Sequence, residues 1–235
     1  MLKKSKSLTA QSLARYFDHT FLKANATIND MKKLCDESIH YGFRMVAINP
    51  VWVPFCKEVL KGSDVHVGAA IGFPLGQNTI ETKVFETKNS LELGADEIDY
   101  VINISKLKEK DYAYIEQEMI EIIDLCRKYH ATSKVIFENC YLTDQEKKEL
   151  CRIACKVKPD YIKTSTGFGT GGALIEDLKL MKECVDGSGI KLKAAGGIRS
   201  LETALELIDL GVERIGSTSS VTIVNEFQNA TASNL

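Results

Sequence analysis

Short runs of apolar and β-branched residues alternate along this chain with longer stretches in which apolar residues recur at helical spacing. Such an alternation is typical of repeated βα units around a parallel sheet. Several of the short runs are almost continuously apolar, as expected for strands buried on both faces. Eight strands are predicted, at residues 16–21, 44–48, 66–72, 97–102, 134–139, 160–164, 191–194 and 214–216.

The helical spacing is clearest in two segments, where apolar residues recur every three or four positions. Residues 112–126 and 201–208 are therefore predicted to form helices that pack one face inward. Gly94, Gly187 and Gly211 each follow a helical segment and precede a strand. Glycine at such a position ends a helix in the left-handed conformation without the steric penalty of a side chain. The glycines thus mark the same boundaries as the periodicity.

Eight βα units in a chain of 235 residues predict an α/β protein with a single closed (β/α)8 barrel, a TIM barrel. An open doubly wound sheet is the alternative. Because no linker, low-complexity tract or residue repeat interrupts the series, we expect one domain over residues 1–235. This domain is expected to begin with a short helical extension, about residues 1–14, and to end in a frayed polar tail, about residues 226–235.

Composition narrows the class of protein. Forty-four per cent of the residues are hydrophobic and 26% are charged, with a formal net charge of −2. This balance is typical of a globular protein and predicts no nucleic-acid or membrane partner. Seven cysteines without a C-x-x-C pair indicate reduced thiols. The start of the chain lacks the apolar stretch of a secretory signal, so we expect a cytoplasmic protein.

Two lysines stand at the ends of neighbouring predicted strands, where barrel enzymes place their active sites. Lys163 precedes a loop rich in glycine, and Lys193 takes the matching position on the next strand. Adjacent parallel strands lie about 4.8 Å apart, so the two ammonium groups approach each other if both face the barrel mouth. Burial and a nearby cation both lower the pKa of a lysine and make it nucleophilic. Two alternatives stay open: both lysines are solvated, or Lys191, which faces the same way, replaces Lys193.

Two carboxylates lie inside otherwise apolar strands. Asp99 belongs to the fourth predicted strand and Asp18 to the first. A buried carboxylate requires a cationic or hydrogen-bonding partner, and lysines inside the barrel would supply one. Asp99 is therefore a candidate for proton transfer, and Asp18 for hydrogen bonding to a substrate. Structural ion pairs are the alternative for both.

Glycine-containing turns follow the last three strands, at residues 170–172, 196–199 and 216–219. Backbone N–H groups in such turns, and at the N-termini of the following helices, can hold a phosphate group. Arg199 adds a positive charge, whereas the alternative is that these glycines only permit tight turns. The four histidines are scattered, and metal-binding and nucleotide-binding motifs are lacking. We therefore expect neither a metal nor another cofactor.

Five motifs occur in an order that resembles the deoxyribose-phosphate aldolases, class I aldolases built on a (β/α)8 barrel. The resemblance extends over residues 18–224. The motifs are DHT at 18–20, IGFPLGQNTIETK at 71–83, DEIDYVIN at 96–103, YIKTSTGFGTGGA at 161–173 and KAAGGIR at 193–199.

The resemblance implies reversible cleavage of 2-deoxy-D-ribose 5-phosphate to D-glyceraldehyde 3-phosphate and acetaldehyde, without a metal, in deoxyribonucleotide catabolism. It implies a Schiff base on Lys163, assistance by Lys193, and proton transfer by Asp99. Hydrogen bonds to the sugar are then expected from Asp18, Thr20 and Thr166. Contacts with the phosphate are expected from Gly171, Gly172, Gly196, Gly197, Arg199, Gly216, Thr218 and Ser219.

Some positions depart from the pattern of the family. Ala47 and Ser105 stand where many members have cysteine and glycine, and the chain ends at Leu235, where some members end in tyrosine. Two other functions stay open: a Schiff-base aldolase for another phosphorylated sugar, and a non-catalytic barrel that binds a phosphorylated metabolite. The expected partners are the sugar phosphate and acetaldehyde. A homodimer is the favoured oligomer, although the sequence does not fix the oligomeric state.

Overall fold

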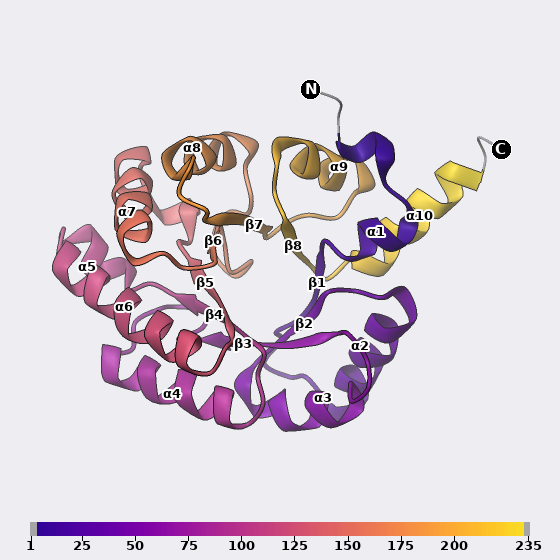
Figure 1. Cartoon of the computed structure of the whole chain (residues 1–235), viewed down its shortest axis with the longest axis horizontal. Coiled ribbons are helices and arrows are strands. Elements are labelled where there is room, and N and C mark those ends of the chain that lie inside the picture. The colour runs from indigo at the N-terminus through magenta and orange to yellow at the C-terminus, as the bar shows by residue number, and fades with distance from the viewer. Residues whose placement is uncertain (1–3, 233–235) are drawn as a thin grey trace.

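The computed structural model describes residues 4–232 and contains a closed barrel of parallel strands. The strands follow one another around the barrel in chain order, and the helices surround them (Figure 1). The predicted (β/α)8 TIM barrel is therefore confirmed. Its strands are β1 (Phe17–Phe21), β2 (Met45–Ile48), β3 (His66–Ile71), β4 (Glu97–Val101), β5 (Thr132–Ile136), β6 (Tyr161–Lys163), β7 (Lys191–Ala195) and β8 (Arg214–Ser217).

Seven of the strands agree with their predicted bounds to within one residue, and β5 differs. It begins at Thr132 instead of residue 134 and ends at Ile136 instead of residue 139. The reason for the early end is Glu138, whose backbone is left-handed, with φ 58° and ψ 60°. A residue in this conformation cannot continue a strand. The shift places Lys134 near the middle of β5 rather than at its start.

The helices cover the outside of the barrel and begin at polar caps. Thr27, Thr79, Thr143 and Ser200 each accept a hydrogen bond from the backbone of the first helical turn. Gly94, Gly187 and Gly211 have the positive φ expected of residues that end a helix. The main helices are α2 (Ile28–Tyr41), α3 (Val53–Val59), α4 (Ile80–Glu92), α5 (Ile104–Lys108), α6 (Tyr112–Lys128), α7 (Asp144–Val157), α8 (Ile175–Val185), α9 (Leu201–Leu210) and α10 (Ser220–Ala232). The short ones are the 3-10 helices η1 (Lys4–Ser7), η2 (Pro50–Trp52) and η3 (Asn139–Tyr141), and α1 (Ala10–Ala14).

Near the two ends of the described chain, α1 packs against α10 (Figure 1). The prediction of a frayed tail from residue 226 is wrong, because α10 continues to Ala232. Ile223, Val224 and Phe227 are buried and give the helix an apolar face, so the polar residues that follow continue the helix on its exposed side. Residues 1–3 and 233–235 of the expected extension and tail lie outside the described residues.

The apolar core fills the layer between the strands and the helices. Ile98 and Tyr100 of β4, for example, belong to this core, whereas Glu97 and Asp99 alternate with them and face the barrel interior. The interior therefore contains buried charges, unlike the layers of branched apolar side chains usual in such barrels. Gly68 of β3 leaves the space that the Met45 side chain occupies, since a Cβ there would lie 2.3 Å from the Met45 sulfur.

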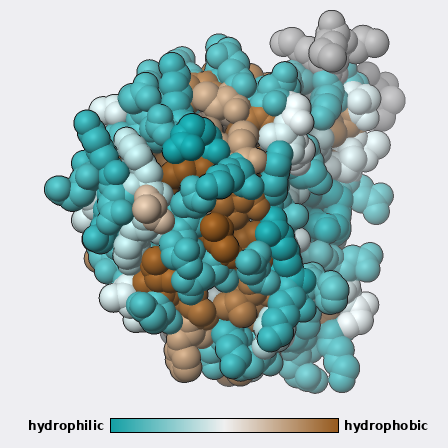
Figure 2. Space-filling view, turned by 60° about the vertical axis from the view of Figure 1, so that its left-hand side comes forward, coloured by the Kyte–Doolittle hydropathy of each residue, from teal (hydrophilic) through white to brown (hydrophobic). Residues whose placement is uncertain are grey.

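The surface in Figure 2 is mainly hydrophilic, with separate hydrophobic patches. Such scattered apolar exposure is usual for a folded protein. None of the described helices combines the length and apolar character that crossing a membrane requires. All seven cysteines are free, and four of them are buried in the core.

Candidate active site

Three side chains from different strands meet inside the barrel: Asp99 of β4, Lys163 of β6 and Lys193 of β7. The Oδ2 atom of Asp99 lies 2.7 Å from Lys163 Nζ and 2.6 Å from Lys193 Nζ. The two lysines are direct neighbours in the register of β6 and β7. All three side chains are buried. The structure thus brings together the residues that the sequence singled out.

Lys191 and Lys193 differ in their surroundings. Lys193 is fully buried, whereas the side chain of Lys191 is half exposed, with its amine 3.6 Å from Glu213 at the start of β8. Lys191 also lies over the ring of Tyr161. Lys191 is therefore remote from Asp99, and the geometry favours Lys193 as the lysine that interacts with Lys163.

Three further charged residues were not predicted and complete the cluster. Lys134 Nζ lies 2.7 Å from Asp99 Oδ1 and 2.5 Å from Glu97 Oε2. Arg214 contacts Glu97 at 3.0 Å and also pairs with Asp18. The alternation of strand side chains was the available signal, since Glu97 and Asp99 must share one face of β4.

Asp18 takes part in structural ion pairs, which is the alternative that the sequence left open. Its carboxylate is fully buried, forms an ion pair with Lys193 at 2.5 Å and accepts a hydrogen bond from Arg214 Nε at 2.7 Å. Asp18 therefore belongs to the charged cluster and not to the cavity wall. Thr20, two residues further along β1, does line the cavity, and its hydroxyl donates to the Asp18 carbonyl at 2.8 Å.

The buried environment sets the charges of Asp99 and Lys163. Burial alone would raise the pKa of Asp99, but Lys134, Lys163 and Lys193 outweigh it and hold that pKa well below its ordinary value. Burial, helped by the cations of Lys193 and Lys134, lowers the pKa of Lys163 to about 8 against the opposing pull of Asp99. About one molecule in ten then has a neutral Lys163 at pH 7, compared with about one in two thousand for a solvated lysine.

Lys134 responds in the opposite direction. Asp99 and Glu97 outweigh the effect of burial and raise the pKa of Lys134, so this lysine stays protonated. The cluster as a whole contains one more cation than carboxylates, and loss of the proton from Lys163 would balance it. Its members are the cations Lys134, Lys163, Lys193 and Arg214 and the carboxylates Asp18, Glu97 and Asp99.

A cavity of about 310 Å³ opens above Lys163, at the ends of β1, β6, β7 and β8. Lys23, which was not predicted, adds a cation to its wall just beyond β1. The same strand-end argument that identified Lys163 would have found it. The predicted residues that line the cavity are Thr20, Lys163, Thr166, Gly196, Gly197, Arg199, Gly216 and Thr218.

Gly171, Gly172 and Ser219 are not part of the cavity wall. Gly172 supports it from behind, because a Cβ at this position would lie 2.3 Å from the carbonyl oxygen of Gly196. The N–H of Ser219 is used within its own turn, where it donates to the Ser217 hydroxyl at 2.9 Å. Gly196 itself has a left-handed backbone, with φ 90°, that a side chain would strain.

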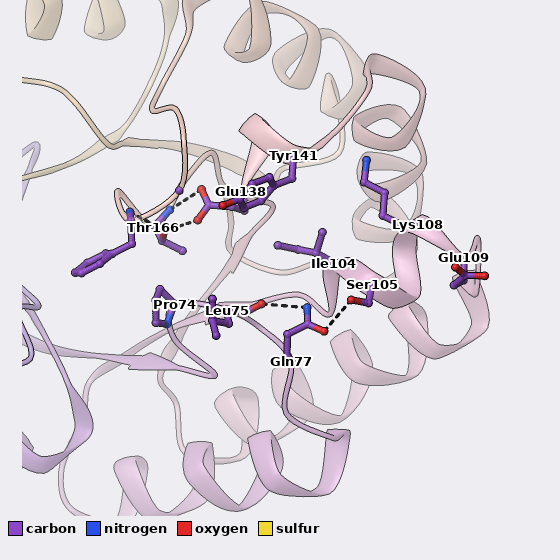
Figure 3. Close-up of a pocket in the computed structure, with 12 residues that line it drawn as sticks. Pro74, Leu75, Gln77, Ile104, Ser105, Lys108, Glu109, Glu138, Tyr141 and Thr166 are labelled. Atoms are coloured by element: carbon purple, nitrogen blue, oxygen red, sulfur yellow. Dashed lines mark hydrogen bonds between the residues drawn. The ribbon is translucent and has the colours of Figure 1, made fainter.

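A second, side cavity of about 410 Å³ adjoins the first and shares Thr166 and Phe168 with it. Figure 3 shows this side cavity between the loop that follows β3, helix α5 and the end of β5. Gln77 donates to the Leu75 carbonyl at 3.2 Å and accepts from the Ser105 hydroxyl at 2.9 Å along its rim. Ser105 thus faces the side cavity, whereas Ala47 is buried in β2.

Comparison with known proteins agrees with this geometry. Residues 12–219 match the model of the DeoC/LacD family aldolases. The deoxyribose-phosphate aldolase of Lactobacillus acidophilus is 58% identical over 215 residues, which are 92% of this chain and 90% of that protein. The one from Thermococcus kodakarensis is 50% identical over 92% of this chain and 97% of its own.

A solved structure of a related protein has the same fold. The tetrameric deoxyribose phosphate aldolase of Aeropyrum pernix superimposes with a TM-score of 0.88 at 31% identity, over 94% of this chain and 93% of its own. The match to the family model and these similarities cover nearly the whole barrel, including every member of the buried charged cluster. The chain therefore belongs to the DeoC/LacD family of aldolases.

Proposed function

We propose that this protein is a deoxyribose-phosphate aldolase that cleaves 2-deoxy-D-ribose 5-phosphate reversibly through a Schiff base on Lys163. The observation that supports the proposal most strongly is the position of Lys163, buried at the cavity floor between Asp99 and Lys193 with its pKa lowered to about 8. An amine in this state is a nucleophile near neutral pH. The names of the relatives supply the substrate.

The reaction begins when the neutral amine of Lys163 adds to the C1 aldehyde of the open-chain sugar. The resulting carbinolamine loses water to give a protonated imine. Loss of the C3 hydroxyl proton then breaks the C2–C3 bond, and the electron pair moves through C2 into the imine to leave an enamine. D-Glyceraldehyde 3-phosphate departs, C2 takes up a proton, and water releases acetaldehyde from Lys163.

Asp99 is suited to the proton transfers in this sequence. Its carboxylate touches Lys163 and stays ionised, so it can accept a proton from the lysine or the carbinolamine and return it. Lys193, the neighbour of Lys163 on β7, opposes protonation of the free amine because it lowers the pKa of Lys163. The glycine turns beyond β7 and β8, together with Lys23 and Arg199, are suited to hold the phosphate at the other side of the cavity.

The decisive experiment traps the imine. The protein is incubated with acetaldehyde and sodium borohydride, and peptides are analysed by mass spectrometry. We expect a reduced two-carbon adduct on Lys163, none in Lys163→Ala, and loss of sugar-phosphate cleavage in that variant. Lys191→Ala is the matched control, because Lys191 is a half-exposed lysine on the next strand. Cleavage that persists in folded Lys163→Ala would contradict the proposal.

The cellular setting is part of the same proposal. We place the reaction in deoxyribonucleotide catabolism in the cytoplasm, where the free thiols stay reduced. The homodimer expected from the sequence stays a prediction, since the Aeropyrum pernix relative is a tetramer. Sedimentation of the purified protein would determine the oligomeric state of this chain.

A further inference from the structure

Glu138 is a buried carboxylate that the proposed reaction does not use. It follows β5, has only 1% of its surface exposed, and has a left-handed backbone with φ 58°. Within residues 4–232, no cationic group lies within 4.0 Å of its oxygens. A buried anion without a cationic partner is costly unless hydrogen-bond donors replace the lost water, so its contacts indicate what holds it there.

Most of those contacts come from one residue, Thr166. The Thr166 N–H donates to Glu138 Oε1 at 3.2 Å, and the Thr166 hydroxyl donates to Glu138 Oε2. The Cys140 thiol lies 3.9 Å from Oε1. All three groups act as donors, so Glu138 accepts with both oxygens. Figure 3 shows the two contacts between Glu138 and Thr166.

The loop around Thr166 is packed tightly against this carboxylate. A Cβ at Gly169 would lie 2.7 Å from the Cys140 sulfur and 3.2 Å from Glu138 Cδ. The loop therefore closes over Glu138 only because residue 169 has no side chain. The strained backbone of Glu138 and the close approach of Gly169 together fix where Thr166 lies.

These contacts determine which hydrogen bond the Thr166 hydroxyl can still form. Its single proton is given to Glu138, and one lone pair accepts the N–H of Phe168 at 3.0 Å. A hydroxyl oxygen has two lone pairs, so one remains. Thr166 lines the same cavity as Lys163. Toward a bound substrate it can therefore accept a hydrogen bond but cannot donate one.

We infer that Glu138 is a positioning residue that sets substrate specificity: it orients the Thr166 hydroxyl so that its oxygen accepts a hydrogen bond from the hydroxyl of the phosphorylated acceptor aldehyde. The inference rests on the proposed function and adds to it a requirement for a hydroxyl donor on the acceptor. An acceptor without that hydroxyl leaves the Thr166 oxygen unpaired in a buried site, which lowers its reactivity.

The test compares two acceptors in the direction of synthesis, with acetaldehyde as the donor. One is D-glyceraldehyde 3-phosphate, and the other is 3-oxopropyl phosphate, which lacks only the hydroxyl. We expect kcat/KM of the unmodified protein to favour the hydroxylated acceptor at least about tenfold, the effect of one well-formed hydrogen bond. The quantity compared among variants is this ratio of kcat/KM values.

In Glu138→Gln the ratio is expected to fall to within about twofold of one. The amide has nearly the same shape, but its NH₂ must face either the Thr166 N–H or the Thr166 hydroxyl, so one of the two contacts is lost or reversed. Thr166→Val should lower the ratio equally, whereas Thr166→Ser should keep it. Glu109→Gln, which removes an exposed carboxylate from the rim of the side cavity, is the matched control and should also keep it.

Equal kcat/KM for both acceptors in the unmodified protein would overturn the inference, as would an unchanged ratio in Glu138→Gln or Thr166→Val. A purely structural Glu138 would lower both values by one factor and leave the ratio intact. If Glu138→Gln does not fold, the comparison of Thr166→Val with Thr166→Ser decides. Imine trapping with acetaldehyde needs no acceptor, so an adduct on Lys163 together with equal ratios would reject this inference while keeping the proposed function.

Discussion

Lys163 and Lys134 lie in one buried cluster, yet their surroundings move their pKa values in opposite directions. Lys134 sits between two carboxylates, Glu97 and Asp99, which raise its pKa. Lys163 contacts only Asp99 and shares it with two other lysines, so burial dominates and lowers its pKa. The number of carboxylates within reach thus separates a lysine whose pKa is raised from one whose pKa is lowered.

Removal of the neighbouring cation should move the pH dependence of imine formation. Lys193→Met removes the neighbouring positive charge that lowers the pKa of Lys163. Asp99 then pairs with one lysine fewer, so it interacts more strongly with Lys163. The pKa of Lys163 should therefore rise by about one unit or more, and imine formation should require a correspondingly higher pH. The measurement is the rate of trapping with acetaldehyde and cyanoborohydride between pH 6 and 10.

Lys191→Met is the matched control for that experiment, since it removes a half-exposed lysine from the same strand. Its profile should coincide with that of the unmodified protein. A shift of the Lys193→Met profile toward lower pH would contradict the electrostatic role given to Lys193.

The lowered pKa of Lys163 should also cost stability. The folded pKa of about 8 lies below the ordinary value of 10.5, so the unfolded chain binds more protons between these limits. Stability from this group is therefore lost as the pH falls from 10.5 to 8 and stays lost below 8. The change amounts to about 3 kcal/mol, because each pKa unit corresponds to about 1.4 kcal/mol.

Lys163→Met removes this penalty. The free energy of unfolding of the variant, relative to the unmodified protein, should be higher at pH 7 than at pH 10.5 by about 3 kcal/mol. Urea unfolding at the two pH values measures it. The same difference at both would show that the fold does not oppose protonation of Lys163.

Lys134 and Arg214 were not predicted as members of the cluster, because the sequence does not show how the strands are paired. The predicted β5 began at Lys134, which placed that lysine at the end of the barrel opposite the site. The strand actually begins at Thr132, and Lys134 is level with Asp99. Arg214 is the first residue of β8, yet it pairs with Lys193 in the middle of β7. Alternation shows which face a side chain takes, but only the pairing of strands shows its height in the barrel.

Among the elements, α10 is longer than the sequence analysis predicted. Most residues after 225 are polar, which suggested a frayed tail, but Phe227 continues the apolar face formed by Ile223 and Val224. One apolar residue at the right spacing is enough to hold the last turns against α1, because the helix needs only one buried face. Most strands were predictable because they are short and apolar, and the ends of α4, α8 and α9 were predictable because a glycine follows each of them.

Phe227→Ala should therefore destabilise the protein by about 3 kcal/mol, as expected for a large buried side chain. Gln228→Ala is the control, since residue 228 is exposed on the same helix. Its effect should stay within about 0.5 kcal/mol. Denaturant unfolding of both variants provides the measurement, and equal small effects would support the frayed tail that the sequence suggested.

At the scale of the whole molecule, the charged cluster joins six of the eight strands. Its members come from β1, β4, β5, β6, β7 and β8, and β2 adds Met45, whose sulfur lies 3.5 Å from Lys134 Nζ. The barrel is thus linked across its interior by ion pairs, while the apolar core holds it to the helices. The strands cannot shift past one another without separating buried charges.

Lys134→Met should reveal how much this linkage contributes. The substitution leaves Glu97 and Asp99 with fewer cations in a buried space, which typically costs 3–5 kcal/mol. We expect a loss of about 3 kcal/mol in urea unfolding, because Arg214 and Lys193 still pair with the two carboxylates. Lys191→Met again serves as the control and should change stability by less than about 0.5 kcal/mol. A loss as small as the control's would mean that the interior ion pairs are energetically neutral.

The ionic interior also limits how this barrel can change during evolution. A single substitution at Glu97, Lys134 or Arg214 removes one ion-pair partner from an opposite charge in a space where solvent cannot replace it. Two substitutions that remove a carboxylate and its cation together avoid that cost. Sequence drift inside the barrel should thus proceed through compensated pairs, whereas the apolar layer outside it accepts single changes of similar volume. Mutant libraries that vary one interior position at a time should contain mostly unstable variants. Libraries that vary a carboxylate and its cation together should contain the stable ones.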